Sequence, residues 1–505
     1  RDHTLEIKAL LSDGSEATFG KLTRDEFRKK CIENSLEGKI YRQIDEILSD
    51  KETQKEIYNQ YPDPRINRRN TGYALDILLE SNIFADQGED FNFCRLLAGS
   101  EGSLAMFTEI KLNLVPVPPP NIALICVHMH NLEEALQANL VALAHQPVAV
   151  ELIDKIVLDC TKSNITQRKN RFFIQGDPGA ILVVEFAEYD PQTMHTKAQA
   201  MIAAMKSNNL GYHYPVLQGN DINRVWALRK AGLGLLSNMP GDAKPVAVIE
   251  DTAVHVDVLP QFVGELKVLL SNMNLECVYY AHIGAGEIHL RPILNLKNPS
   301  DIERFYQIAR ETAILVKKYR GSLSGEHGDG RLRGEFIPLM LGNKIYGLLQ
   351  QIKNTWDPLN ILNPGKIVDT PSMKSSLRYD SSRLTPEVKT YFRYPEADGF
   401  LRAVEKCNGS GDCRKQVSAK GVMCPSYQAT TDESATTRAR ANILREFITN
   451  SNKKNPFDHH EIKDILDLCL SCKGCKSECP SNVDMAKYKA EFLQQYYNSN
   501  RIPFK

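Results

Sequence analysis

The sequence has neither an excess of charge of one sign nor a long hydrophobic run. Its 62 Lys and Arg residues balance 62 Asp and Glu residues, so the formal net charge is zero. Nothing therefore indicates nucleic acid or an anionic membrane surface as a partner. No apolar run approaches the roughly 18–20 residues that a membrane-spanning helix needs. We expect a chain without a transmembrane segment and without a nucleic-acid partner.

The sequence also lacks cysteines in a pattern typical of secreted domains. Five of its 12 cysteines are scattered through mostly apolar segments, and the other seven crowd into residues 407–479. Scattered cysteines in apolar surroundings are expected to be buried free thiols. Free thiols are typical of a reducing compartment. We therefore expect a cytoplasmic protein, either free or peripheral at the inner membrane.

The N-terminus has no leading element. The chain begins on Arg1, without a Met or a signal peptide, and runs directly into a hairpin pattern over residues 4–19 with Asp13 and Gly14 at the turn. A domain that begins inside a sheet has the character of a fragment. We expect an earlier part of this domain to be missing, and the end at Lys505 is compatible with a second cut.

A dense cysteine motif near the C-terminus is the most specific feature of the chain. Cys469, Cys472, Cys475 and Cys479 follow one another at spacings of two, two and three residues, and Pro480 closes the motif. This is the bacterial ferredoxin pattern for iron–sulfur ligation. Zinc sites usually take two well-separated ligand pairs, and adjacent disulfides fit such crowding badly. The motif predicts an iron–sulfur cluster and hence electron transfer.

A second cysteine set lies upstream and is incomplete, because Ser410 stands between Cys407 and Cys413 where a third cysteine would be expected. Cys424 follows, again before a proline. In two-cluster ferredoxins the Cys-Pro cysteine ligates the other cluster. That rule gives one complete [4Fe–4S] site, made of Cys424, Cys469, Cys472 and Cys475. It also gives a second site with three thiolates, from Cys407, Cys413 and Cys479.

The second site has several readings. Three thiolates can hold a [3Fe–4S] cluster, a [4Fe–4S] cluster with a non-cysteine ligand, or no cluster. In the simplest alternative the four contiguous cysteines hold a single cluster and the upstream three are structural. We favour two cluster sites.

Two loops in the first 115 residues could approach a cofactor. Residues 99–102 form a Gly/Ser loop before a strand, and glycines let backbone N–H groups come close to a phosphate or a ring. Residues 65–73 form a basic loop that ends near Gly72, and for this loop a solvated surface is favoured over a cofactor edge.

Residues 121–370 alternate strand and helix patterns, with strands expected at 122–127, 148–152 and 180–186 and helices at 132–144 and 196–207. This order fits two helices on one antiparallel sheet, the split βαβ arrangement, better than a doubly wound sheet.

Two Gly-rich motifs in this region contain side chains that could bind a metal or act in catalysis. His282 and His289 lie seven residues apart across a Gly-rich turn, and Glu326 and His327 follow in a second Gly-rich segment. Each histidine alone is more often structural. Together they offer three ligands for a divalent metal with an open position, and a neutral imidazole as a base. Imidazole and carboxylate ligands suit Zn, Mn, Fe or Co.

The loop at residues 99–102, followed by a strand containing Thr108 and Glu109, resembles the FAD-binding domain of the vanillyl-alcohol-oxidase-type flavoproteins. The resemblance implies FAD as a cofactor, and it implies an earlier half-domain that this chain does not contain. Residues 363–366 match the end of the same family's substrate domain near the flavin. The implied flavin contacts are Gly99, Ser100, Glu101, Gly102 and Asn363.

The histidine motifs resemble those of FAD-dependent D-2-hydroxy acid dehydrogenases, including the D-2-hydroxyglutarate and D-lactate enzymes. The sequence differs from the family in having Ala285 between the two glycines of the first motif. The resemblance implies that His327 is the catalytic base and that Arg229 and Lys244 bind the substrate. The implied metal ligands are His282, His289 and Glu326.

The expected fold class is α+β with three domains. Residues 1–115 are expected to form the second half of an FAD-binding domain of the vanillyl-alcohol-oxidase type, and residues 116–370 a ferredoxin-like antiparallel-sheet substrate (cap) domain. Residues 371–400 are a polar linker, and residues 401–505 an all-α iron–sulfur domain.

The expected function is the oxidation of a D-2-hydroxy acid by FAD, with electrons leaving through the iron–sulfur domain. D-2-hydroxyglutarate, oxidised to 2-oxoglutarate, is the first substrate, and D-lactate or glycolate the second. The acceptor is a quinone or an electron-transfer protein. Two other classes compete: an electron-transfer subunit without catalysis, and a zinc hydrolase. The sequence leaves open whether the chain forms a homo-oligomer.

Overall fold

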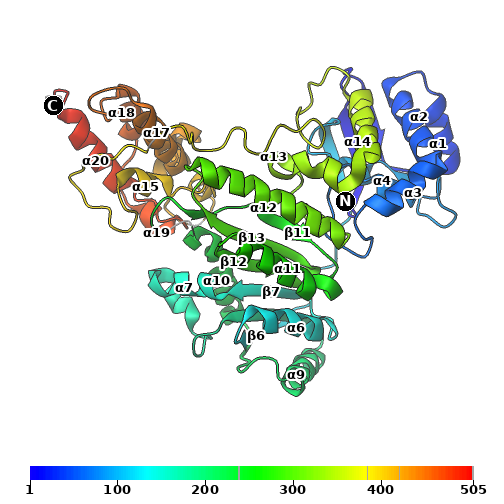
Figure 1. Ribbon diagram of the computed structural model, residues 1–505, viewed down its shortest axis with the longest axis horizontal. Coiled ribbons are helices and arrows are strands. Elements are labelled where there is room, and N and C mark those ends of the chain that lie inside the picture. Colours follow the sequence, from blue (N-terminus) through cyan, green and yellow to red (C-terminus); the bar gives the residue numbers. More distant parts are fainter. Residues whose placement is uncertain (237–238, 384, 420, 503–505) are drawn as a thin grey trace.

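The computed structural model describes residues 1–236, 239–383, 385–419 and 421–502. A large central sheet with its helices separates an N-terminal unit from a helical C-terminal unit, and the two ends of the chain lie in these outer units (Figure 1). Within the described residues, none of the helices combines the length and the apolar character needed to cross a lipid bilayer.

The N-terminal unit is built on a three-stranded antiparallel sheet in the order β2-β1-β5. The predicted hairpin forms, with Ile7 opposite Phe19. The strands are β1 (Thr4–Leu10), β2 (Glu16–Phe19) and β5 (Met106–Leu112), with a small pair β3 (Lys21–Leu22) and β4 (Phe91–Asn92). The helices are α1 (Arg24–Ile32), α2 (Leu36–Ser49), α3 (Lys51–Gln60), α4 (Leu75–Leu79) and α5 (Cys94–Leu97).

A helix from much later in the chain completes this unit. Helix α14 (Ile337–Trp356) lies beside α1–α4 (Figure 1), and its Trp356 ring packs 5.4 Å from Phe19 and 5.5 Å from Phe93 between ring centroids. The buried Lys353 ammonium donates to the carbonyl of Ser103 at 2.8 Å. The segment expected to close the cap domain therefore folds onto the N-terminal sheet, because its apolar face has its complement there.

The central sheet is antiparallel throughout and consists of two ferredoxin-like halves. In the first half, β6-α6-β7 and β8-α9-β9 interleave as β7-β8-β6-β9, the split βαβ order. In the second half, β11-α11-β12-β13-α12 gives the order β12-β13-β11. The halves join where β7 pairs with β12, Leu152 opposite Ala281. The strands are β6 (Asn121–Met129), β7 (Ala149–Asp154), β8 (Ala180–Glu188), β9 (Val216–Leu217), β10 (Lys244–Pro245), β11 (Ile249–Ala253), β12 (Cys277–His282) and β13 (Glu287–Leu294).

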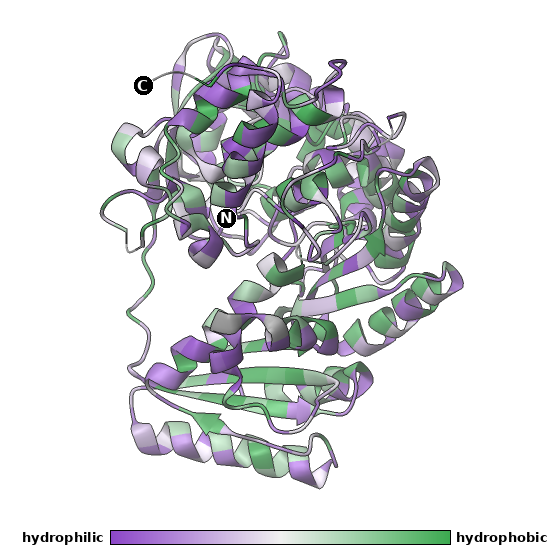
Figure 2. Cartoon of the chain, turned by 90° about the vertical axis from the view of Figure 1, so that its left-hand side faces the viewer, coloured by the Kyte–Doolittle hydropathy of each residue, from purple (hydrophilic) through white to green (hydrophobic). Residues whose placement is uncertain are grey.

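Helices cover both faces of this sheet, where the sequence indicated two helices on one sheet. One face packs on α6 (Leu132–Leu143), α9 (Pro191–Ser207), α11 (Leu259–Asn272) and α12 (Pro299–Lys318). The other face packs on α7 (Lys155–Ser163) and α10 (Asn220–Leu236), over the first half and the adjoining strand β12. The strands are accordingly hydrophobic along much of their length (Figure 2).

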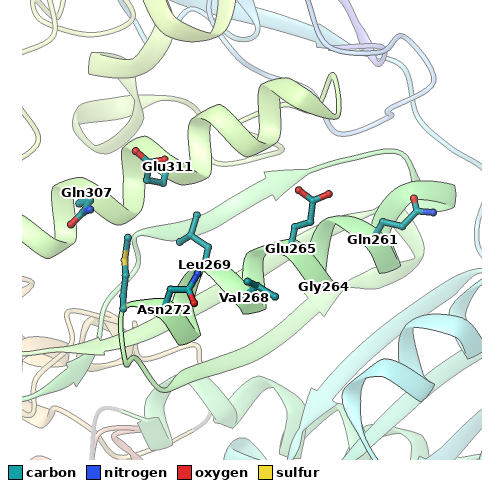
Figure 3. A pocket seen from close by; sticks show the side chains of 9 residues that line it. Gln261, Gly264, Glu265, Val268, Leu269, Asn272, Gln307 and Glu311 are labelled. Carbon is teal, nitrogen blue, oxygen red and sulfur yellow. The ribbon is translucent and has the colours of Figure 1, made fainter.

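A groove lies on the outer surface between α11 and α12, with a volume of about 870 Å³ (Figure 3). Its lining includes the apolar Val268 and Leu269 and the acidic Glu265 and Glu311. It is on the face of the sheet opposite to the histidines, and it holds none of the predicted site residues.

The C-terminal unit is all-helical around its own core. Residues 371–383 and 385–399 reach it without forming a helix or a strand. Its helices are α15 (Phe400–Glu405), α16 (Pro425–Thr430), α17 (Thr437–Asn450), α18 (His460–Asp467), α19 (Gly474–Glu478) and α20 (Met485–Tyr497). Shorter helices elsewhere are α8 (Ile165–Arg168) and α13 (Gly330–Arg333).

Candidate functional site

Strand register gathers polar side chains on one face of the central sheet, where its two halves meet. Glu287 pairs with His282, and His289 lies opposite both Tyr280 and Glu250. Because side chains alternate along a strand, these residues point to the same face. This is the face that α10 covers over the first half of the sheet. A polar cluster therefore lies on this face at the junction of the two halves.

Four potential metal ligands converge in this cluster. The donor atoms of His282, Glu287, His289 and Glu326 all lie within 4.8 Å of one another. His327 stacks on His289 with ring centroids 5.4 Å apart, and its Nε2 is 3.5 Å from Glu326 Oε1. The structure thus brings together the four residues of the two Gly-rich motifs. Glu287, which the sequence analysis did not select, joins them.

The segment that carries Glu326 and His327 is anchored by a buried carboxylate on β11. Asp251 accepts hydrogen bonds from the backbone N–H of Glu326 at 2.8 Å and of His327 at 3.0 Å, and from the hydroxyl of Ser324 at 2.9 Å. Burial raises the pKa of Asp251, but its interaction with the Glu287 carboxyl and the hydrogen bond from the Glu326 N–H outweigh this effect and lower it. The carboxylate therefore remains an acceptor for the whole segment.

Arg68 reaches the cluster from the basic loop of the N-terminal unit. Its guanidinium pairs with Glu287 and, at 2.8 Å, with Glu326. Burial raises the pKa of Glu287 well above its usual range, while Arg68 opposes that shift. The sequence analysis favoured a solvated surface for this loop, whereas the structure places one of its arginines at the histidines.

Arg229 reaches the cluster from α10. Its guanidinium pairs with Glu151 on β7, and Glu151 Oε1 is also 2.8 Å from His282 Nδ1. Glu151 therefore orients the first histidine and holds Arg229 next to it.

Lys244 is not brought to this group. It lies on β10 opposite Leu294, five residues along β13 from His289, which corresponds to about 17 Å of strand. Its ammonium donates to the carbonyl of Met239.

The predicted flavin loop packs directly against the second Gly-rich motif. The Glu101 carboxylate accepts hydrogen bonds from the backbone N–H of Asp329 at 2.6 Å and of Gly330 at 3.1 Å. Asn363 donates from its side chain to the Glu101 carbonyl at 2.6 Å. Gly102 and Gly330 both have positive φ, and a Cβ on either would meet no atom within 4 Å. The two loops therefore present bare backbone to open space.

The remaining predicted flavin residues, Gly99 and Ser100, are the buried residues of the same loop. Ser100 is fully buried and donates to the Leu97 carbonyl at 2.9 Å. Gly99 lies against the guanidinium of Arg1, which would have to move to admit a side chain at this position.

The seven clustered cysteines line two separate cavities in the C-terminal unit. One cavity is lined by Cys424, Cys469, Cys472 and Cys475. The other is lined by Cys407, Cys413 and Cys479, with Ser410 beside them. Cys479 is thus separated from the three cysteines that precede it in sequence, and this is the crossed grouping that the two Cys-Pro positions predict.

Two parts of the chain match known protein families. Residues 118–367 match the family of FAD linked oxidases, C-terminal domain, and residues 406–484 match the 4Fe-4S dicluster domain. The chain therefore contains an FAD-linked oxidase C-terminal domain followed by a 4Fe-4S dicluster domain.

Particular relatives align with the whole chain. The chain is 30% identical over 553 aligned residues to a D-2-hydroxyglutarate dehydrogenase of Pseudomonas putida, and 27% identical over 556 to one of Escherichia coli. Each alignment covers 100% of this chain and 53% of the relative, so the chain spans about half the length of these relatives. Among solved structures, p-cresol methylhydroxylase is 11% identical, with 72% of this chain and 65% of that chain covered and a TM-score of 0.44.

Proposed function

We propose that this chain is part of an FAD-dependent dehydrogenase that oxidises a D-2-hydroxy acid, with D-2-hydroxyglutarate as its first substrate. The observation that carries the proposal is the convergence of His282, His289, Glu326 and His327 beside Arg229. A unit that only relays electrons needs none of these side chains. A family match to FAD linked oxidases and similarity to two D-2-hydroxyglutarate dehydrogenases support the same assignment.

The donor set fits a divalent metal. Buried Glu287 Oε1 and His289 Nδ1 have no hydrogen-bond partner, and burial lowers the pKa of His289 to about 4, so its imidazole is neutral and able to coordinate. His282, His289 and Glu326 would hold the ion, with Glu287 next to them. Zn, Mn, Fe and Co all suit such ligands.

The flavin loops fit a flat cofactor. Gly102 and Gly330 offer uncovered backbone, and Asn363 and Glu101 hold the two loops together. Glu101, Gly102 and Asn363 would line one side of the flavin, with the buried Ser100 and Gly99 behind them in the same loop.

In the reaction, Arg229 binds the carboxylate of the substrate beside His282, since a guanidinium pairs with a carboxylate through two parallel hydrogen bonds. His327 accepts the proton of the 2-hydroxyl as general base. The bound metal would lower the pKa of that hydroxyl and the bound flavin would take the Cα hydrogen as hydride, which leaves the 2-oxo acid. His289, stacked on His327, holds the base against the sheet.

The two cysteine cavities fit the two iron–sulfur sites of a dicluster domain. The cavity of Cys424, Cys469, Cys472 and Cys475 supplies four thiolates for a [4Fe–4S] cluster. The cavity of Cys407, Cys413 and Cys479 supplies three thiolates for a second cluster, with Ser410 as a neighbouring oxygen. Electrons would leave to a quinone or an electron-transfer protein, in the cytoplasm or at the surface of the inner membrane.

The test is the reduction of bound flavin by D-2-hydroxyglutarate, D-lactate and glycolate in an anaerobic stopped-flow experiment. His327→Asn is expected to lower the rate by roughly 10²–10⁴-fold while flavin and metal stay bound. The matched control is His195→Asn on the exposed face of α9, which should reduce at the wild-type rate.

Two results would contradict the proposal. Wild-type rates in His327→Asn would remove the base assignment. Failure of all three acids to reduce the wild-type flavin, while dithionite still reduces the iron–sulfur sites, would favour an electron-transfer subunit without catalysis.

A further inference from the structure

A buried arginine touches the cavity with four cysteines. Arg440 on α17 is 1% exposed and lines this cavity. Its Nη1 donates to Cys424 Sγ at 3.5 Å and to Ser426 Oγ at 3.0 Å, and its Nε donates to the Ile465 carbonyl at 3.0 Å. Thr437, one turn earlier on the same helix, donates its hydroxyl to Cys424 Sγ at 3.6 Å.

The charge of Arg440 has no carboxylate to balance it among the described residues, and its Nη2 is buried without a hydrogen-bond partner. The carboxylate of Asp484, whose negative charge raises the pKa of Cys475, forms ion pairs with Lys473 at 3.6 Å and Lys476 at 3.2 Å. A full positive charge therefore lies buried against Cys424, one of the four cysteines of this cavity. In such surroundings a charge acts strongly on its neighbours.

The cavity with three cysteines is different. Its arginine, Arg438, pairs with Glu433 at 2.6 Å and its side chain is 29% exposed. Ion pairing and solvent both weaken the effect of this charge on Cys407 and Cys413. The arginine that lines the four-cysteine cavity is thus buried and without a carboxylate partner among the described residues, whereas the arginine that lines the three-cysteine cavity is ion-paired and partly exposed.

The two cavities also differ in what they face. Pro480, directly after Cys479, lies against Gly234 of α10, and Arg378 donates to the Cys407 carbonyl at 3.0 Å. The three-cysteine cavity is therefore next to the central unit. Cys472 of the other cavity is exposed, and Leu470 beside it is 71% exposed. The four-cysteine cavity is thus open to an external acceptor.

We propose that Arg440 is a positioning residue that raises the reduction potential of the cluster held by Cys424, Cys469, Cys472 and Cys475, so that electrons collect there after passing the three-cysteine site. The inference rests on the two-cluster assignment in the proposed function. A cluster gains one electron on reduction and its net charge falls by one unit. A fixed cation and hydrogen bonds to its sulfurs favour that reduced state.

The test is a redox titration of the cluster-loaded protein with dithionite and ferricyanide, monitored through the EPR signals of both clusters. In the wild type, the cluster at Cys424 is expected to be reduced first, at the higher midpoint potential. Arg440→Gln should lower the midpoint of this cluster and leave the other unchanged. Arg440→Lys should retain most of the wild-type value because it keeps the charge. Cys413→Ser, which disturbs the three-cysteine site, identifies which signal belongs to which cavity.

Thr437→Val serves if Arg440→Gln does not fold. It removes one hydroxyl donor to Cys424 at nearly constant volume, so a smaller lowering of the same midpoint is expected. Arg438→Gln is the matched control from the same helix, and it should leave the Cys424 cluster unchanged.

A wild-type protein in which the three-cysteine cluster has the higher potential would overturn the proposal. An unchanged midpoint in both Arg440→Gln and Thr437→Val would do the same. Iron and sulfide counts on the same samples test the cluster assignment separately. A count that fits two clusters, with unchanged midpoints, contradicts only the role of Arg440. A count that fits one cluster contradicts the two-cluster assignment on which that role rests.

Discussion

At the scale of single residues, burial sets the protonation state of the histidines that the fold uses. His289 is 3% exposed in its side chain, and its low pKa keeps it neutral at the site. His128, in the core of the central sheet, is also fully buried, but it has a purely structural environment. Its Nδ1 is 2.9 Å from the Cys126 carbonyl, and its Nε2 accepts from the backbone N–H of Gln175 at 3.2 Å. The first contact needs a proton on Nδ1, and the second needs Nε2 without one, so together they require the neutral ring with its proton on Nδ1.

His128 should therefore make the stability of the protein fall at acid pH. Burial lowers its pKa from 6.5 to about 4, so the stabilising effect of the neutral ring is complete above pH 6.5 and is lost as the pH falls towards 4. The loss amounts to roughly 3 kcal/mol at the acid end. His128→Asn keeps a donor and an acceptor without a titrating group. We expect its melting temperature to fall less steeply between pH 7 and pH 5, measured by calorimetry. Equal slopes for both proteins would contradict this role.

The sequence was sufficient to select residues whose motif is local. His282 and His289 were selectable from their spacing across a Gly-rich turn, and Glu326 and His327 from their adjacency. Glu287 had a usable signal as well, because it stands two residues before His289 and must share its face in a strand. Arg68 had none, since its partner Glu326 is 258 residues away in the chain.

At the scale of elements, the segment at residues 324–330 has no helix or strand of its own before α13, and neighbouring elements fix its shape. Asp251 on β11 holds one side of it through the N–H groups of Glu326 and His327. Glu101 holds the other side through Asp329 and Gly330. Two carboxylates from different units thus fix the backbone that positions the predicted metal ligand Glu326 and the predicted base His327.

Asp251→Asn should loosen this segment without removing a ligand. The amide has one acceptor oxygen instead of two and brings an N–H₂ group towards backbone donors. Loss of such an outer partner typically costs roughly 10–100-fold in metal affinity. Metal content after dialysis against a chelator, measured by mass spectrometry, checks the expectation. Asp257→Asn, an exposed carboxylate a few residues on, is the control and should keep the wild-type content. Wild-type metal retention in Asp251→Asn would show that the segment holds its shape unaided.

Strand and helix order in the central sheet was readable from the sequence, because β6 and β8 are nearly continuous apolar runs and α6 and α9 each bury residues at helical spacing. The joining of two such halves through β7 and β12 was not, since register between distant strands leaves no local trace. The placement of α14 on the N-terminal sheet was equally hidden. Its partners Phe19 and Phe93 lie more than 200 residues earlier.

At the scale of the whole molecule, ion pairs hold the C-terminal unit against the central one. Asp242 pairs with Arg402 at 2.9 Å, and Lys297 pairs with Glu405 at 2.7 Å. Both partners in the C-terminal unit lie on α15, which ends just before Cys407. The contact that fixes the two units is thus next to the three-cysteine cavity, on the side of α10.

The close approach of α10 to Pro480 should govern electron transfer between the units. A Cβ on Gly234 would lie 2.5 Å from Pro480 Cβ, so Gly234→Val must push the C-terminal unit away. Because electron transfer slows with distance, we expect slower cluster reduction by substrate, with flavin reduction unchanged, in stopped-flow traces of the holoenzyme. Gly264→Ala on α11, where the added Cβ meets no atom within 4 Å, is the matched glycine control and should leave both phases unchanged. If Gly234→Val left the cluster phase as fast as in the wild type, electrons would have to enter the C-terminal unit by a route other than Cys479 and α10.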